Sequence, residues 1–182
     1  KRFHLLLLEK DANCFENKKI SQEINEWEKD NIMNKDFNIK PEDSNKYTPH
    51  ELGYHQTNRV DFEKGCYTGQ EIVARMHYLG KPKRRSFLLV SQHFQLEEST
   101  LIHEHPIRIY SKNTSDEEEV GSLITFSNYA FYGKELTFYG LGEFDLGRMA
   151  SLENNSFFIK STGGVVDLTL GTLPFQNKII TD

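Results

Sequence analysis

Hydrophobic and polar positions divide the chain into an N-terminal part with helical spacing and a C-terminal part of short apolar runs. In the first part, residues 2–9 have the pattern of a buried strand and residues 31–39 that of a weaker one. Between them, five apolar residues recur at spacings of three to five, which predicts an amphipathic helix ending near Asp30. They are Ala12, Phe15, Ile20, Ile24 and Trp27. This strand–helix–strand order predicts half of an α+β sandwich.

The C-terminal part is almost entirely strand-like. Its apolar runs cover residues 85–92, 105–111, 119–127, 134–144, 155–161 and 165–173. Short apolar runs separated by turn residues are typical of strands. A hairpin turn is expected at Ser161–Gly164, because glycine accepts a positive φ without strain. The pattern therefore predicts a small antiparallel barrel or sandwich over about residues 83–175.

A helix is predicted between these two parts, directly after the sequence KGCYTGQE at residues 64–71. Thr68 and Glu71 have the spacing of a capping box, in which the side chain of each residue bonds the backbone amide of the other. Apolar residues then follow at helical spacing, so they are expected to form a buried face. They are Ile72, Val73, Met76 and Leu79.

Cys66 lies two residues before the predicted cap and two after Lys64. A helix N-terminus carries partial positive charge, and both this charge and the Lys64 ammonium favour a thiolate over a thiol. The residues support two interpretations equally: a functional thiolate, or a small buried cysteine with no chemical role.

Composition narrows the classes of protein to consider. The 182 residues suffice for one large or two small domains, and a net charge of −5 does not indicate general nucleic-acid binding. The two cysteines, Cys14 and Cys66, are far apart and are expected to be free thiols of a reducing compartment. The apolar run Leu5–Leu8 is too short to span a bilayer. We therefore expect a cytoplasmic protein that does not enter membranes.

Basic residues and histidines could add further chemistry. A basic cluster follows the motif and consists of Arg75, His77, Lys81, Lys83, Arg84 and Arg85. It is either a solvated face or a contact surface for an anionic partner such as RNA or a phosphorylated or polyglutamylated ligand. The histidines at 50, 55, 77, 103 and 105 match no closed zinc spacing, so no permanent metal site is predicted. An exposed thiolate at Cys66 could still offer one ligand to an iron–sulfur cluster.

The stretch KGCYTGQEIVAR, residues 64–75, resembles the motif of YgfZ-type folate-binding proteins, relatives of the glycine cleavage T protein. The motif residues are Lys64, Gly65, Cys66, Tyr67, Gly69, Gln70, Glu71 and Arg75. YTPHEL (47–52), EVGSLITF (119–126) and LGTLPF (170–175) also resemble segments of that family. The family's N-terminal region has no counterpart here, and we expect the start of a longer protein to be missing.

The resemblance implies a fold. Residues 1–60 would belong to a folate-binding domain of the ferredoxin-like, T-protein type, of which the strand–helix–strand is a remnant. Residues 61–82 would form the motif loop and helix, and residues 83–182 the C-terminal antiparallel β-barrel. The expected fold class is accordingly α+β.

The resemblance also implies a function: binding of tetrahydrofolate in support of the assembly or repair of iron–sulfur enzymes, including those that modify tRNA. Cys66 would be the functional thiol, and Trp27 would lie beside the folate, although periodicity alone favours Trp27 as a core residue. The implied partners are folate, iron–sulfur proteins or their assembly factors, and tRNA indirectly. No aminomethyl transfer has to be catalysed.

Two other functions remain open. A folate-dependent aminomethyl- or methyltransferase of the T-protein class would need general acid–base groups in the motif loop rather than a thiol. An RNA-binding module would use the basic cluster.

The chain also departs from the family's Ile-Glu-Ala-Gly sequence at residues 32–35. Met33 replaces a carboxylate able to bond a pterin, and Lys35 replaces a glycine.

Overall fold

The structure is a computed structural model that describes residues 20–36, 39–91, 106–112, 117–131, 135–152, 156–161 and 164–171. The strand expected over residues 2–9, the first part of the predicted helix and Cys14 lie outside these residues.

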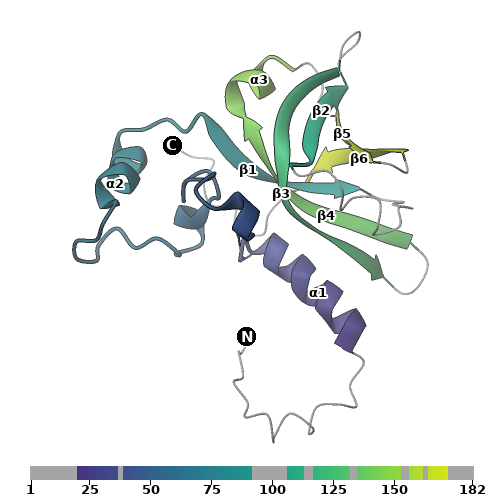
Figure 1. The fold of residues 1–182 in the computed structure, drawn as a ribbon, viewed down its shortest axis with the longest axis horizontal. Coiled ribbons are helices and arrows are strands. Elements are labelled where there is room, and N and C mark those ends of the chain that lie inside the picture. The colour runs from purple at the N-terminus through teal and green to yellow at the C-terminus, as the bar shows by residue number, and fades with distance from the viewer. Residues whose placement is uncertain are drawn as a thin grey trace, which may run out of the picture.

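A closed antiparallel barrel forms the C-terminal part (Figure 1). Its strands are β1 (Arg84–Ser91), β2 (Arg108–Lys112), β3 (Glu117–Phe131), β4 (Glu135–Asp145), β5 (Ser156–Ser161) and β6 (Gly164–Leu170). They are arranged in the order β1-β4-β3-β2-β5-β6, and β6 closes the ring by pairing with β1. The antiparallel barrel predicted from the apolar runs is confirmed.

The interior of the barrel holds the main hydrophobic core, to which strands β1 to β6 all contribute. Phe144 and Phe157 meet edge to face with ring centroids 5.0 Å apart, and both side chains are fully buried. Gly121 on β3 allows close approach of β4, because a Cβ at this position would lie 2.0 Å from the carbonyl oxygen of Glu143. A short helix, α3 (Leu146–Ala150), follows β4, and Asp145 caps it by accepting bonds from two backbone amides.

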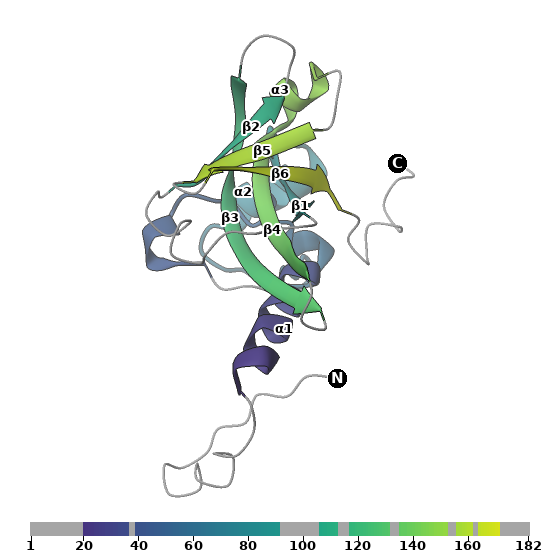
Figure 2. The ribbon, with the colours of Figure 1, turned by 90° about the vertical axis from the view of Figure 1, so that its right-hand side faces the viewer.

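A second core lies on the outside of the barrel, where α1 (Ile20–Met33) packs against β3 and β4 (Figure 2). Ile32 of α1 and Leu52 meet Leu88, Ile124 and Leu141 of the barrel, and all five side chains are buried. The N-terminal segment and the barrel are therefore joined by an apolar contact.

The strand predicted over residues 31–39 is wrong in its first part. Residues 31–33 form the last turn of α1, and no strand is found in the described residues 20–83. The helix continues because Ile32 is 2% exposed and Met33 packs on the same outer core, so tertiary burial decides the conformation of this apolar pair. Lys35 ends the helix with a φ of 50°. This left-handed conformation gives a physical reason for a glycine at the same place in the family pattern.

Candidate functional site

The motif loop connects the short helix η3 (Tyr54–Gln56) to α2 (Gln70–Tyr78). Figure 1 shows α2 standing away from the barrel, with the segment that holds η2 (Pro41–Asp43) and η3 between α2 and α1. Cys66 is exposed on this loop. The interpretation of Cys66 as a buried filler is therefore wrong, and its sulfur is open to reagents and partners.

The capping box predicted at Thr68 and Glu71 is wrong. The N-cap residue is Gly69, at φ 87°, and no side chain caps the helix. The loop is instead closed from the first helical residue, since Gln70 Oε1 accepts a bond from the backbone N–H of Tyr67 at 3.0 Å. A left-handed turn at Gly69 shifts the helix start by one residue, and glycine takes that conformation without strain.

Lys64 and Tyr67 lie on either side of Cys66 in the sequence and form a cation–π contact with each other. The Lys64 Nζ lies 4.4 Å from the centroid of the Tyr67 ring. Because Gln70 holds the backbone of Tyr67, this chain of contacts fixes the residues on both sides of the cysteine. Of the other motif residues, Gly65, Glu71 and Arg75 are exposed.

The apolar face predicted for α2 is exposed rather than buried. Ile72 is 68% exposed and Leu79 is 83% exposed, and Tyr78 is 68% exposed as well. Val73 and Met76 are partly buried. Large exposed apolar side chains grouped on one short helix are typical of a contact surface.

Trp27 lies on α1 and is 39% exposed. The prediction from periodicity, which made it a core residue, is wrong. A partly exposed tryptophan is suited to stack on a flat aromatic ligand. Figure 1 shows that α1 and α2 lie on opposite sides of the η2–η3 segment, so the sequence-predicted site residues fall on two faces.

Aromatic rings attach α2 to the rest of the chain. His77 of α2 stacks on Phe62 with centroids 3.7 Å apart, and it lies 6.0 Å from the ring of His50. His50 in turn stacks on His55 at 4.7 Å. Burial, with His77 nearby, lowers the pKa of His50. Burial and several basic neighbours lower the pKa of His55 to about 4. Both imidazoles are therefore neutral at pH 7.

Lys35 is a buried cation that the sequence reasoning treated only as a missing glycine. It is 0% exposed, and its Nζ donates to Gln56 Oε1 at 3.3 Å and to the Ser86 carbonyl oxygen at 3.2 Å. Burial, followed by the charge of Arg85, lowers its pKa to about 8. The bond to Ser86 connects the end of α1 to β1.

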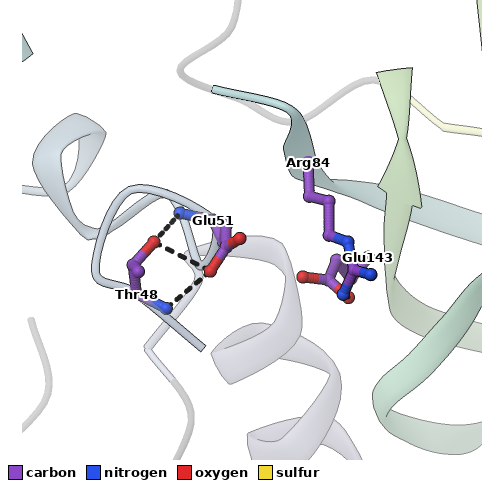
Figure 3. Close-up of polar contacts among 4 residues, drawn as sticks. All are labelled: Thr48, Glu51, Arg84 and Glu143. Atoms are coloured by element: carbon purple, nitrogen blue, oxygen red, sulfur yellow. Dashed lines mark hydrogen bonds and ion pairs between the residues drawn. The ribbon is translucent and has the colours of Figure 1, made fainter. Parts of the chain in front are cut away.

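A carboxylate site at the contact of the loop with the barrel was also missed. Glu51 Oε2 accepts bonds from Thr48 N at 2.7 Å and Thr48 Oγ1 at 2.8 Å (Figure 3). The two residues have the capping-box spacing that the sequence predicts for Thr68 and Glu71. Glu143 on β4 is 4% exposed, and its Oε2 lies 3.3 Å from Arg84 Nη1. Burial raises the pKa of Glu143, and the negative charge of Glu51 adds to this effect.

The described residues contain no preformed metal site. No group of three or more His, Cys, Asp or Glu side chains among them is arranged to hold one. No helix in the same part of the chain is long and apolar enough to cross a membrane.

Comparison with known proteins places the chain beside YgfZ-type proteins. It is 55% identical to the tRNA-modifying protein YgfZ of Colwellia psychrerythraea over 49 residues, which is 27% of this chain and 15% of that protein. It is 31% identical to the YgfZ protein of Vibrio atlanticus over 85 residues, 46% of this chain and 26% of that protein. It is also 38% identical to the iron–sulfur cluster assembly factor IBA57 homolog of Dictyostelium discoideum over 56 residues, 31% of this chain and 14% of that protein.

The resemblance predicted from the motif is confirmed by these matches, over part of each chain. The matched stretches span between 14% and 26% of the three relatives' own length. No family model matches the chain.

Proposed function

We propose that this chain acts as a folate-binding accessory protein that supports iron–sulfur enzymes, including those that modify tRNA, through the thiol of Cys66. The observation that carries this proposal is the exposure of Cys66 on a loop whose flanking residues are held in place. The names of the relatives, a tRNA-modifying protein and an iron–sulfur cluster assembly factor, support the same role.

An exposed cysteine can act in two ways without catalytic residues of its own. It can provide one ligand to an iron–sulfur cluster, or it can exchange with a disulfide of a partner. The exposed apolar side chains of α2, next to this loop, offer a surface on which a partner protein could dock. The motif is thus suited to protein contact as well as to chemistry.

Tetrahydrofolate binding is the second part of the proposal and rests on Trp27. The indole is partly exposed on α1, the helix that also contributes Ile32 to the outer core, and a pterin ring is flat enough to stack on it. Met33, at the place of the family's carboxylate, packs on that core and cannot bond a pterin. Folate would therefore depend more on stacking here than in relatives that keep the carboxylate.

The fluorescence of Trp27 tests folate binding directly, because Trp27 is the one tryptophan of the chain. Tetrahydrofolate should change this emission saturably and should raise the temperature of unfolding. The Trp27→Phe variant, read by unfolding temperature, should lose most of the shift. If tetrahydrofolate changes neither signal, the folate part of the proposal fails while the role of Cys66 stays testable.

The aminomethyltransferase alternative is less well supported. Such an enzyme needs a general acid or base at the reacting centre. The motif loop presents an exposed cysteine, and Glu71 is its one carboxylate between Lys64 and Arg75. The chain would be tested for transfer of an aminomethyl group from a carrier protein. If the Cys66→Ala variant keeps this activity, the result would favour the transferase.

A further inference from the structure

Basic side chains from four segments come together beneath α2. Lys35 follows α1, His50 and His55 lie in and around η3, Arg85 is on β1, and His77 is on α2. The rings of His50 and His55 stack at 4.7 Å, and those of His50 and His77 lie 6.0 Å apart. We refer to these five residues as the basic wall.

Three nitrogen atoms of this wall are buried and find no hydrogen-bond partner in the described part of the chain. They are His50 Nε2, His55 Nδ1 and Arg85 Nε. His50 is only 5% exposed, so water does not readily replace the missing partner. Buried polar groups are normally bonded, and a charged donor left alone costs more than a neutral one. Arg85 Nε carries a hydrogen and therefore lacks an acceptor, and the two imidazole nitrogens lack a hydrogen-bond partner in the same part of the chain.

The residues that lower the pKa values of His50 and His55 are all basic. Besides burial, the groups that lower the pKa of His55 are His50, Lys35, Arg85 and His77, in that order, and the group that lowers the pKa of His50 is His77. No carboxylate is among them. The charge of Arg85 also lowers the pKa of Lys35, so these two cations repel one another unless an anion lies between them.

We propose that His50, His55 and Arg85 form a binding site for a small oxyanion, either a phosphate or a carboxylate group, next to the positive charge of Lys35. The planar guanidinium of Arg85 suits the oxygen geometry of both groups. Arg85 and His55 are only partly buried, so other atoms of these side chains reach solvent beside the buried nitrogens. The bound anion removes the repulsion and so strengthens the attachment of α2, which carries the motif.

This site rests on observations that are independent of folate and of Cys66. The proposed site also predicts that anion binding depends on pH. An anion favours the charged form of a nearby imidazole, so binding should be coupled to proton uptake by His55 or His50. Because the pKa of His55 is about 4 without the anion, against 6.5 for an unperturbed histidine, affinity for an anion of constant charge should increase as the pH falls from about 6.5 toward about 4.

Thermal unfolding in inorganic phosphate provides the test. Phosphate should raise the unfolding temperature saturably above that in chloride of the same ionic strength, since it binds the folded state. Arg85→Gln should weaken the apparent phosphate affinity by about tenfold or more, as expected for the loss of one charge-assisted hydrogen bond. Lys83→Gln is the matched control, because Lys83 is exposed and carries the same charge two residues away. Its phosphate response should equal that of the unaltered chain.

Two further measurements determine how binding depends on pH and which kind of anion binds. Sulfate, whose charge is constant over this range, should bind more tightly at the lower pH, and acetate at the same concentrations separates a carboxylate site from a phosphate site. If Arg85→Gln does not fold, the imidazole NMR signals of the unaltered chain decide: phosphate should shift those of His50 and His55. Equal unfolding temperatures in phosphate and chloride, or equal losses in both variants, would overturn the proposal, as would imidazole signals that do not move.

Discussion

Lys35 fills the space in which a side chain at Gly53 would have to lie. A Cβ built on Gly53 would be 2.5 Å from Lys35 Nζ and 2.9 Å from Lys35 Cδ, and Gly53 itself has a φ of 75°. The family pattern has a glycine at the position of Lys35, just after α1. The larger lysine fits here because the loop residue that it contacts, Gly53, has no side chain.

Gly53→Ala should accordingly destabilise the protein. The left-handed backbone disfavours any Cβ, and the new methyl group would displace a buried cation from its bonds to Gln56 and Ser86. We expect a loss of about 2 kcal/mol in the free energy of unfolding, measured by urea denaturation. Gly65→Ala is the control, because a Cβ there meets nothing within 4 Å. Similar losses for the two variants would contradict this explanation of Gly53.

Gln70, rather than Thr68, should control the motif loop. Gln70→Ala removes the bond from Tyr67 N, which should cost about 1 kcal/mol and loosen the residues that flank Cys66. Thr68→Ala removes no cap and should change stability by less than about 0.5 kcal/mol. Iodoacetamide kinetics at Cys66, with Cys14 replaced by serine, should change in the first variant and stay constant in the second. If the kinetics change in Thr68→Ala and stay constant in Gln70→Ala, the capping box at Thr68 is correct after all.

Acid should weaken the fold through His55. Its pKa is about 4 in the folded state against 6.5 for an unperturbed histidine. A histidine whose pKa is lower when folded contributes stability that is complete above about 6.5 and is lost as the pH falls toward about 4. In chloride buffer, the unfolding temperature should fall across this range, and His55→Gln should make the fall shallower. An unchanged pH profile in His55→Gln would show that other groups are responsible.

Glu143 and Arg84 should respond unequally to mutation. Because burial raises the pKa of Glu143 in the folded state, ionisation of this carboxyl costs stability, and that cost grows as the pH rises above about 4.5. Arg84→Gln leaves the buried carboxylate without its cation and should lose about 1–2 kcal/mol at pH 7, a modest value because Arg84 is 54% exposed.

Glu143→Gln serves as the comparison for the same pair. It removes the cost of ionisation, so its unfolding temperature relative to the unaltered protein should rise between pH 4.5 and pH 7. Calorimetry at the two pH values checks both variants. Equal destabilisation by the two substitutions at pH 7 would mean that the ion pair itself, rather than the buried carboxyl, dominates.

The barrel could be predicted from the sequence because each strand has its own apolar run and turn residues, as in Phe157–Ile159 and Val166–Leu168. The end of α1 could not, because Ile32 is helical through burial against Leu88 and Leu141, which lie far along the chain. The motif was found from sequence, but the start of its helix was misplaced, since the left-handed Gly69 competes with an equally plausible cap at Thr68.

The basic wall could not be predicted either. Lys35, His50 and Arg85 become neighbours only when α1, the η3 segment and β1 come together, and no local spacing in the sequence signals that arrangement. The Thr48–Glu51 box, by contrast, has the capping-box spacing in the sequence and could have been predicted from it.

The central claim is that the exposed thiol of Cys66 acts in support of iron–sulfur enzymes. It is tested most directly by measuring tRNA thiolation in bacterial cells in which this protein replaces the resident YgfZ-type protein. Because Cys66 is exposed, Cys66→Ala should leave the folded protein level unchanged and should abolish the rescue of tRNA thiolation, while Thr68→Ala should rescue fully. Full rescue by Cys66→Ala at a normal protein level would contradict the account.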